Sequence, residues 1–203
     1  MLNNFCFIIS GLSGTGKTTI ARSLISKFDN IDMSVSFTTR EKRVNEINGI
    51  DYNFINKELF ETMIKEEKFI EYEHIYNNLY GTSKDAIIDV LSNNKNILLD
   101  VNYEGFESLK KNQSFNIVSL FILPPSMDIL IDRLKKRGES DDNIKRRMNS
   151  VKNEVFHSQK YDYIVINDSL QEAIQSVQSI YLSSCVKYDK NENYNFALNL
   201  LKY

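Results

Sequence analysis

Proline, glycine and cysteine are scarce in this chain of 203 residues, which contains 2 prolines, 7 glycines and 2 cysteines. Because it has no low-complexity linker and no internal repeat, the chain is expected to fold as a single domain, residues 1–203. Cys6 and Cys185 are far apart and lack metal-ligand spacing, so both are expected to be free thiols in a reducing compartment. His74 and His157 are not spaced like a metal site either.

The sequence also lacks a strong excess of charge, since the formal net charge is −2 at pH 7. This balance does not indicate a general nucleic-acid binder, so any anion site must be built by a few well-placed cations. The apolar start, residues 1–10, is too short to span a membrane and lacks the charged region and cleavage site of a signal peptide. It is predicted to be a first core strand. The protein is expected in the cytoplasm, with neither a membrane nor nucleic acid as partner.

Short apolar runs alternate with segments of helical spacing. The runs predict buried parallel strands at residues 5–9, 97–99, 117–123 and 163–166. Apolar residues at helical spacing predict helices at residues 15–28, 127–136 and 170–182. This alternation predicts an α/β fold, a parallel sheet covered by helices on both faces, with ligands bound outside the carboxyl ends of the strands.

Two segments do not fit that core. Residues 34–93 are rich in Tyr, Phe, Asn and Glu, with mixed strand signals at 34–39 and 69–75, and are predicted to be an insertion that binds the acceptor substrate. Residues 137–160 are densely charged and are predicted to form a helical lid. The core then comprises about residues 1–33, 94–136 and 161–182. The tail, residues 183–203, is a candidate for an additional packed helix.

The strongest local motif is GLSGTGKT at residues 11–18, which matches the P-loop consensus G-x-x-x-x-G-K-[ST] at every fixed position. A predicted strand precedes it and a predicted helix follows it, which is the context that a phosphate loop requires. Lys17 is expected to reach the β- and γ-phosphates of ATP, and the Thr18 hydroxyl to join the Mg²⁺ shell. The predicted ATP-binding residues are Gly11, Ser13, Gly14, Thr15, Gly16, Lys17, Thr18 and Thr19.

Asp100 ends the apolar run 97–99 and is expected to face the phosphate loop. A carboxylate there could hold Mg²⁺ through a water molecule. Taken alone, however, an ordinary strand-ending Asp is the simpler interpretation. A P-loop identifies a nucleotide user but not its second substrate.

Information on the second substrate lies in the insertion. The segment SVSFTTREKR, residues 34–43, places Arg40 and Arg43 three apart after a strand signal, and guanidinium groups can grip a phosphate bidentately. Tyr52 and Tyr80 follow along the chain, as does Glu71. Taken singly, each of these has a simpler interpretation as a solvated basic turn, a half-buried strand aromatic or a surface carboxylate.

Together, the pieces resemble the guanylate kinase family. That family pattern runs from the phosphate loop through S-x-S-x-T-T-R-x-x-R, G-x-D-Y-x-F, F-x-E-[WY] and Y-G-[ST] to an apolar run ending in Asp. It continues with Pro-Pro-Ser, R-L-x-x-R-G and Asn-Asp. This chain has the pieces in that order across about residues 5–180, including PPS at 124–126, RLKKRG at 133–138 and ND at 167–168.

The resemblance implies a role for each matching position. Arg40, Arg43, Tyr52 and Tyr80 would bind the GMP phosphate, and Asp100 is counted with the GMP-binding set. Ser36, Glu71 and Thr82 would read guanine, whose N1–H and N2–H₂ donors suit a carboxylate and whose O6 suits a hydroxyl. Adenine reverses the N1 and exocyclic pattern and would leave buried groups unpaired. Lys17, Arg137 and Arg147 would act on the transferred phosphoryl group.

The implied activity is phosphoryl transfer from MgATP to GMP, and also to dGMP, by a monomer or homodimer. Two departures stand in the segment DVNYEG, residues 100–105, where the family usually reads D-x-D-x-Q-G: Asn102 replaces an acid and Glu104 replaces glutamine. Asn102 is expected to weaken the metal-water shell. Two alternatives stay open: a catalytically weak guanylate-kinase-like interaction domain, and a P-loop kinase for a different small acceptor.

Overall fold

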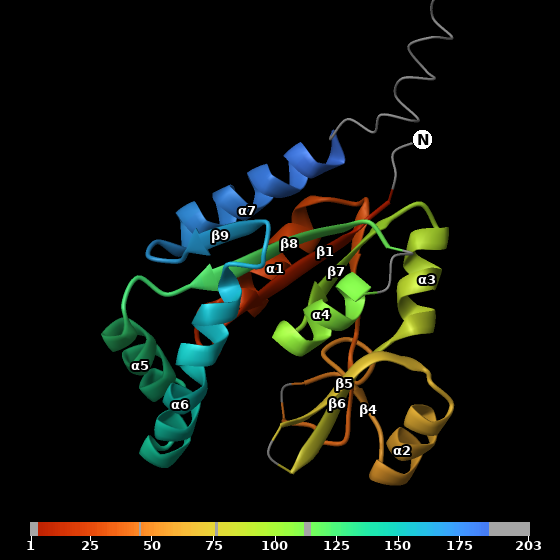
Figure 1. Cartoon of the computed structure of the whole chain (residues 1–203), viewed down its shortest axis with the longest axis horizontal. Coiled ribbons are helices and arrows are strands. Elements are labelled where there is room, and N and C mark those ends of the chain that lie inside the picture. The colour runs from red at the N-terminus through yellow and green to blue at the C-terminus, as the bar shows by residue number, and fades with distance from the viewer. Residues whose placement is uncertain (1–3, 45, 76, 112–114, 187–203) are drawn as a thin grey trace, which may run out of the picture.

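The computed structural model describes residues 4–44, 46–75, 77–111 and 115–186. Its main sheet has five strands in the order β2-β7-β1-β8-β9, and every described pairing in it is parallel (Figure 1). The strands are β1 Cys6–Gly11, β2 Ile31–Met33, β7 Asn96–Asp100, β8 Ile117–Leu123 and β9 Tyr163–Ile166.

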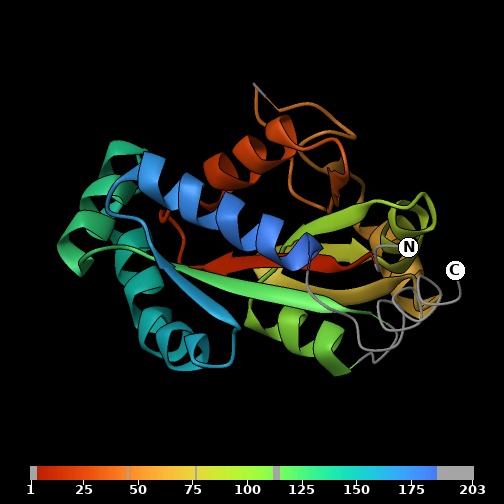
Figure 2. The same cartoon turned by 90° about the horizontal axis from the view of Figure 1, so that it is seen from above.

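Successive side chains of the central strand β1 belong to two separate hydrophobic cores, because they point to opposite faces of the sheet. Phe7 and Ile9 pack with residues of α1 and α7, whereas Cys6 and Ile8 pack with residues of α3, α4, α5 and α6. Figure 2 shows α1 and α7 on one side of the sheet and α4 on the other. The helices are α1 Lys17–Lys27, α3 Lys84–Ser92, α4 Tyr103–Lys111, α5 Met127–Lys136, α6 Asp141–Ser158 and α7 Leu170–Cys185.

A second sheet of four strands has the order β4-β3-β6-β5 and lies within the predicted insertion. Its β3–β6 and β5–β6 pairs are antiparallel, and its β3–β4 pair is parallel. A small core of Phe60, Phe69 and Leu79 joins this sheet to helix α2. The elements are β3 Phe37–Thr38, β4 Asn53–Phe54, α2 Lys57–Lys65, β5 Phe69–Ile75 and β6 Asn78–Ser83.

Two arms project from the main sheet in Figure 1, the second sheet with α2 and the pair α5–α6. Both helices of that pair begin at a serine N-cap: the Ser126 hydroxyl accepts from the Ile129 amide, and the Ser140 hydroxyl accepts from the Asn143 amide. Within the described ranges, no helix is long and apolar enough to cross a bilayer.

The predicted strands at 117–123 and 163–166 and the helix at 127–136 have the bounds expected. The first helix begins at Lys17 rather than at residue 15, because Gly16 is in the left-handed conformation at φ 90° and serves as N-cap. The segment 34–39 yields only the two residues of β3, and the edge strand β2 was not predicted. The additional helix was predicted for the tail, residues 183–203. Residues 187–203 of this tail lie outside the described ranges.

Candidate active site

The P-loop leaves β1 at the carboxyl edge of the main sheet and leads directly into α1. Gly11 has φ +142°, and a Cβ there would lie 2.3 Å from the Ile122 carbonyl oxygen of β8. Gly16 has φ +90°, and a Cβ there would lie 2.6 Å from Nδ2 of Asn167. Glycine is therefore required at both positions, by backbone conformation and by close approach.

The Lys17 ammonium folds back over this loop. Its Nζ donates to the Gly11 carbonyl at 2.7 Å and to the Leu12 carbonyl at 3.2 Å. The Thr15 hydroxyl also donates to the Leu12 carbonyl, at 2.8 Å. The loop thus holds a positive charge beside the N-terminus of α1, whose dipole also favours anions.

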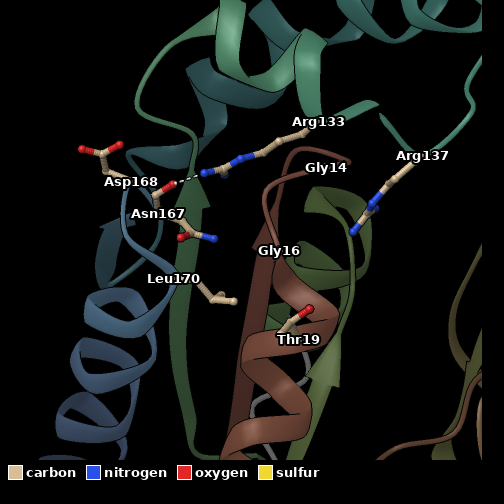
Figure 3. A pocket seen from close by; sticks show the side chains of 8 residues that line it. All are labelled: Gly14, Gly16, Thr19, Arg133, Arg137, Asn167, Asp168 and Leu170. Carbon is tan, nitrogen blue, oxygen red and sulfur yellow. Dashed lines mark hydrogen bonds between the residues drawn. The ribbon is translucent and has the colours of Figure 1, made fainter. Parts of the chain in front are cut away.

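A pocket of about 240 Å³ opens beside the loop (Figure 3). In the figure, Arg133 points toward Asn167, and Arg137 points toward the loop and the start of α1. Arg133 Nη2 donates to the Asn167 carbonyl at 3.0 Å, and Asn167 Nδ2 donates to the Thr15 carbonyl at 2.7 Å. The pocket is lined by Gly14, Gly16, Thr19, Arg133, Arg137, Asn167, Asp168 and Leu170.

Asp100 ends β7, the strand paired with β1, with Ile9 as its register partner. Burial raises the pKa of the Asp100 carboxyl, and the positive charge of Lys17 opposes this rise. Asp100 thus ends the strand next to β1, which leads into the phosphate loop. A carboxylate and the Thr18 hydroxyl offer the oxygen ligands that Mg²⁺ prefers, so the donor set fits this ion.

A cationic and aromatic cluster forms in the second sheet. Arg40 lies over the rings of Tyr52 and Phe54, with its guanidinium carbon 5.5 Å from each ring centroid. The rings of Tyr52 and Tyr80 are 5.8 Å apart. Arg40 Nη2 also donates to Glu46 Oε1 at 2.7 Å, and this bond raises the pKa of the guanidinium and lowers that of the Glu46 carboxyl. The carboxylate therefore helps to hold the charged Arg40 beside the two tyrosines.

Glu71 and Thr82 lie opposite each other on the β5–β6 ladder, and the Thr82 hydroxyl donates to Glu71 Oε1 at 2.5 Å. Burial raises the pKa of the Glu71 carboxyl, and the hydrogen bond from Thr82 opposes the rise. This pair offers a carboxylate and a hydroxyl on one face of the same sheet that carries the Arg40 cluster.

Known proteins resemble this chain in both sequence and structure. The sequence model described as "Guanylate kinase" matches residues 4–184. A guanylate kinase of Rickettsia prowazekii is 40% identical over 181 residues, covering 89% of this chain and 91% of that protein. One of Bartonella henselae is 40% identical over 187 residues, covering 92% and 84%.

The chain belongs to the guanylate kinase family. A solved structure of guanylate kinase from Anaplasma phagocytophilum has a TM-score of 0.74 to this chain at 26% identity, covering 92% of this chain and 89% of that one. The α/β fold with a parallel sheet between helices, which the sequence predicted, is confirmed by this family fold.

The structure brings the predicted residues of this guanylate kinase family member into three groups. The first group surrounds the P-loop, where the phosphoryl donor is expected, and Arg137 lines the pocket beside this loop. The acceptor group comprises the Arg40 cluster and the Glu71–Thr82 pair; Ser36 lies next to β3, while Arg43 is exposed. The third group is in the predicted lid, where Arg147 Nη2 donates to Glu139 Oε1 at 3.0 Å. The functional role of each residue stays a prediction.

Sequence reasoning did not assign Arg133, Asn167, Asp168 and Leu170 to the ATP site, although they line the pocket beside Gly14 and Gly16. The available signal was the family motif itself, since the first arginine of RLKKRG and the ND pair at 167–168 belong to it. Asn102 makes contacts that sequence could not indicate: its Oδ1 accepts from the Gly105 amide at 2.9 Å, and its Nδ2 donates to Glu73. The expectation that Asn102 weakens the metal shell stays a prediction.

Proposed function

We propose that this chain is an ATP:GMP phosphotransferase, which moves the γ-phosphoryl group of MgATP to GMP and also to dGMP, giving ADP and the corresponding nucleoside diphosphate. The observation that carries the proposal is the Glu71–Thr82 pair beside the Arg40 cluster in a member of the guanylate kinase family. The Glu71 carboxylate supplies acceptors for the N1–H and N2–H₂ donors of guanine. The Thr82 hydroxyl would turn from Glu71 to donate its one proton to O6 when the base binds. The cluster supplies a cation and phenolic hydroxyls for the phosphate.

The reaction requires positioning and charge neutralisation rather than a protein nucleophile. An oxygen of the GMP phosphate attacks the γ-phosphorus, the bond to the bridging β–γ oxygen breaks, and ADP leaves. Lys17 binds the β- and γ-phosphates, while Arg137 and Arg147 bind the transferred group. The remaining ATP contacts in this proposal come from the P-loop residues Gly11, Ser13, Gly14, Thr15, Gly16, Thr18 and Thr19.

Arg40, Arg43, Tyr52 and Tyr80 hold the acceptor phosphate in this proposal, and Asp100 lies where the two substrates meet. Mg²⁺ held by the Thr18 hydroxyl, and through water by Asp100, would neutralise charge on the β- and γ-phosphates. We further propose that the protein works in the cytoplasm as a monomer or homodimer, and that its partners are these nucleotides rather than nucleic acid or membrane.

The proposal is tested by measuring phosphoryl transfer from ATP to a panel of acceptors: GMP, dGMP, AMP, CMP, UMP and dTMP. We expect the two guanine nucleotides to give kcat/KM values well above those of the others. Efficient transfer to another acceptor, with little transfer to GMP, would show that the protein is instead a kinase for that nucleotide. ATP binding without transfer to any acceptor would indicate an interaction domain.

A further inference from the structure

The first turn of α4 approaches strand β5 unusually closely at Gly105. A Cβ built there would lie 3.0 Å from Glu71 Cγ, 3.2 Å from Glu71 Cδ and 3.0 Å from Val101 Cβ. Real Cβ contacts seldom become this short, because interiors are packed close to the van der Waals limit. The stem of Glu71 therefore occupies the space that any larger residue at position 105 would need.

Backbone conformation does not explain a glycine at this position. Gly105 lies inside a helix and is absent from the glycines with positive φ. Glycine is also a poorer helix former than alanine, so the first turn of α4 does not itself favour it. The glycine at position 105 is therefore explained by two close neighbours, Glu71 across the interface and Val101 just before the helix.

Glu71 also contacts Thr82, whose hydroxyl donates to Glu71 Oε1 at 2.5 Å. The side chain thus has a hydroxyl of β6 and the backbone of α4 as neighbours. Because the α4 neighbour is helix backbone, it limits how far the Glu71 stem can shift toward the helix.

Asn102 fixes the turn that carries Gly105. Its Oδ1 accepts from the Gly105 amide at 2.9 Å, and its Nδ2 donates to Glu73 Oε2. Glu73 lies two residues after Glu71 on β5, so both carboxyl groups are on the face that packs against α4. The asparagine therefore ties the helix start to the same strand whose glutamate Gly105 contacts.

We propose that Gly105 is a positioning residue for base recognition: by leaving no side chain against Glu71, it sets the depth of that carboxylate in the acceptor site. This inference rests on the proposed function, because it takes guanine as the partner of Glu71. A Cβ at position 105 pushes the Glu71 stem by a few tenths of an ångström. Hydrogen bonds to the two guanine donors are sensitive to displacements of this size.

The test is Gly105→Ala, compared with Ser108→Ala on the same helix as control. We expect the KM for GMP to rise about tenfold or more, with kcat changed by less than about threefold. ATP affinity should stay near the wild-type value, whereas the midpoint of thermal unfolding should fall, because the added methyl group presses on Glu71. An unchanged KM for GMP in an active Gly105→Ala protein would overturn the inference, whereas an inactive wild-type protein would overturn the proposed function instead.

A second comparison keeps the inference testable if Gly105→Ala folds poorly. Glu71→Ala removes the stem that a Cβ at position 105 would meet. We therefore expect Gly105→Ala to lower the unfolding midpoint less in the Glu71→Ala background than in the wild type. Equal losses in both backgrounds would show that Glu71 is not the group that Gly105 accommodates.

Discussion

Individual side chains in this protein depend on a small number of close contacts. Lys17 donates to two loop carbonyls, Glu71 accepts from Thr82, and Glu73 accepts from Asn102. Each contact holds an ionisable group in a defined place. For Lys17 and Glu71, removal of the charge should therefore affect the site more than it affects the fold.

Lys17→Ala should nearly abolish phosphoryl transfer while the protein stays folded. The charge that is lost lies where phosphate charge develops, and a comparable arginine contact in phosphoryl transfer is worth about 10³–10⁵ in rate. The measurement is kcat with saturating ATP and GMP, with thermal unfolding as control. A turnover within tenfold of wild type would remove Lys17 from the mechanism.

Glu71→Gln should impair recognition of guanine specifically. The shape is kept, but one acceptor becomes a donor that faces a guanine donor, and a buried unpaired polar group costs about 1–3 kcal/mol. We expect kcat/KM for GMP to fall roughly ten- to a hundredfold, with little change for AMP and none in ATP affinity. Equal losses for GMP and AMP would mean that Glu71 does not read the base.

Glu73 should make stability depend on pH in the neutral range. Burial, with added repulsion from Glu71 and Glu104, raises the pKa of its carboxyl from the ordinary 4.5 to about 7, although the hydrogen bond from Asn102 opposes this. Between these two values the folded chain holds the proton more tightly than the unfolded chain does. The contribution of Glu73 to the free energy of unfolding therefore falls as the pH rises through that window.

Glu73→Gln removes this ionisation and keeps an oxygen for the Asn102 amide. At pH 8 we expect the variant to exceed the wild type in free energy of unfolding by about 1–2 kcal/mol, since partial exposure screens the full effect. At pH 5 the difference should be small, because Glu73 of the folded wild type is protonated there. Denaturant unfolding of both proteins at both pH values measures it, and a difference independent of pH would contradict the assignment.

Among the elements, length and burial decide what the sequence could predict. β8 and β9 are bounded apolar runs and were predicted with correct ends, whereas β2, β3 and β4 have only two or three residues each. Such short strands carry too few residues for a periodic signal and owe their pairing to neighbouring strands.

The candidate site also has one part that the sequence could predict and one part that it could not. The P-loop could be predicted because its residues are adjacent in sequence and its spacing is set by the phosphate it surrounds. The contacts of Glu71 with Gly105 and of Glu73 with Asn102 join β5 to α4, 34 and 29 residues apart in the chain. Contacts of this kind depend on how the two elements pack, which no local pattern contains.

The second sheet depends on tight packing at Gly81. A Cβ there would lie 2.9 Å from Phe69 Cδ1 and 3.0 Å from Phe60 Cζ, inside the small core of this sheet. We expect Gly81→Ala to lower the free energy of unfolding by about 1–3 kcal/mol through overpacking. Denaturant unfolding measures the loss. In a double-mutant cycle with Phe69→Val the two changes should compensate in part, and strict additivity would exclude the steric cause.

Across the whole molecule, the two sheets divide the two substrate roles that we propose. The P-loop belongs to the main sheet and the Glu71–Thr82 pair to the second sheet. An ion pair joins the two parts, since Arg22 of α1 donates to Asp51 at 2.6 Å, next to Tyr52 of the Arg40 cluster. This contact links the two parts, and in-line transfer requires the two bound nucleotides to be positioned relative to each other.

The most direct test of this account is a time course of the reaction of ATP with GMP, in which the nucleotides are separated and the amounts of ADP and GDP are measured. With Mg²⁺ present, we predict that ADP and GDP appear in equal amounts, that both depend on GMP, and that a metal chelator stops both. ADP formed without GDP, or no GDP from a folded protein that binds ATP and GMP, would contradict the central claim.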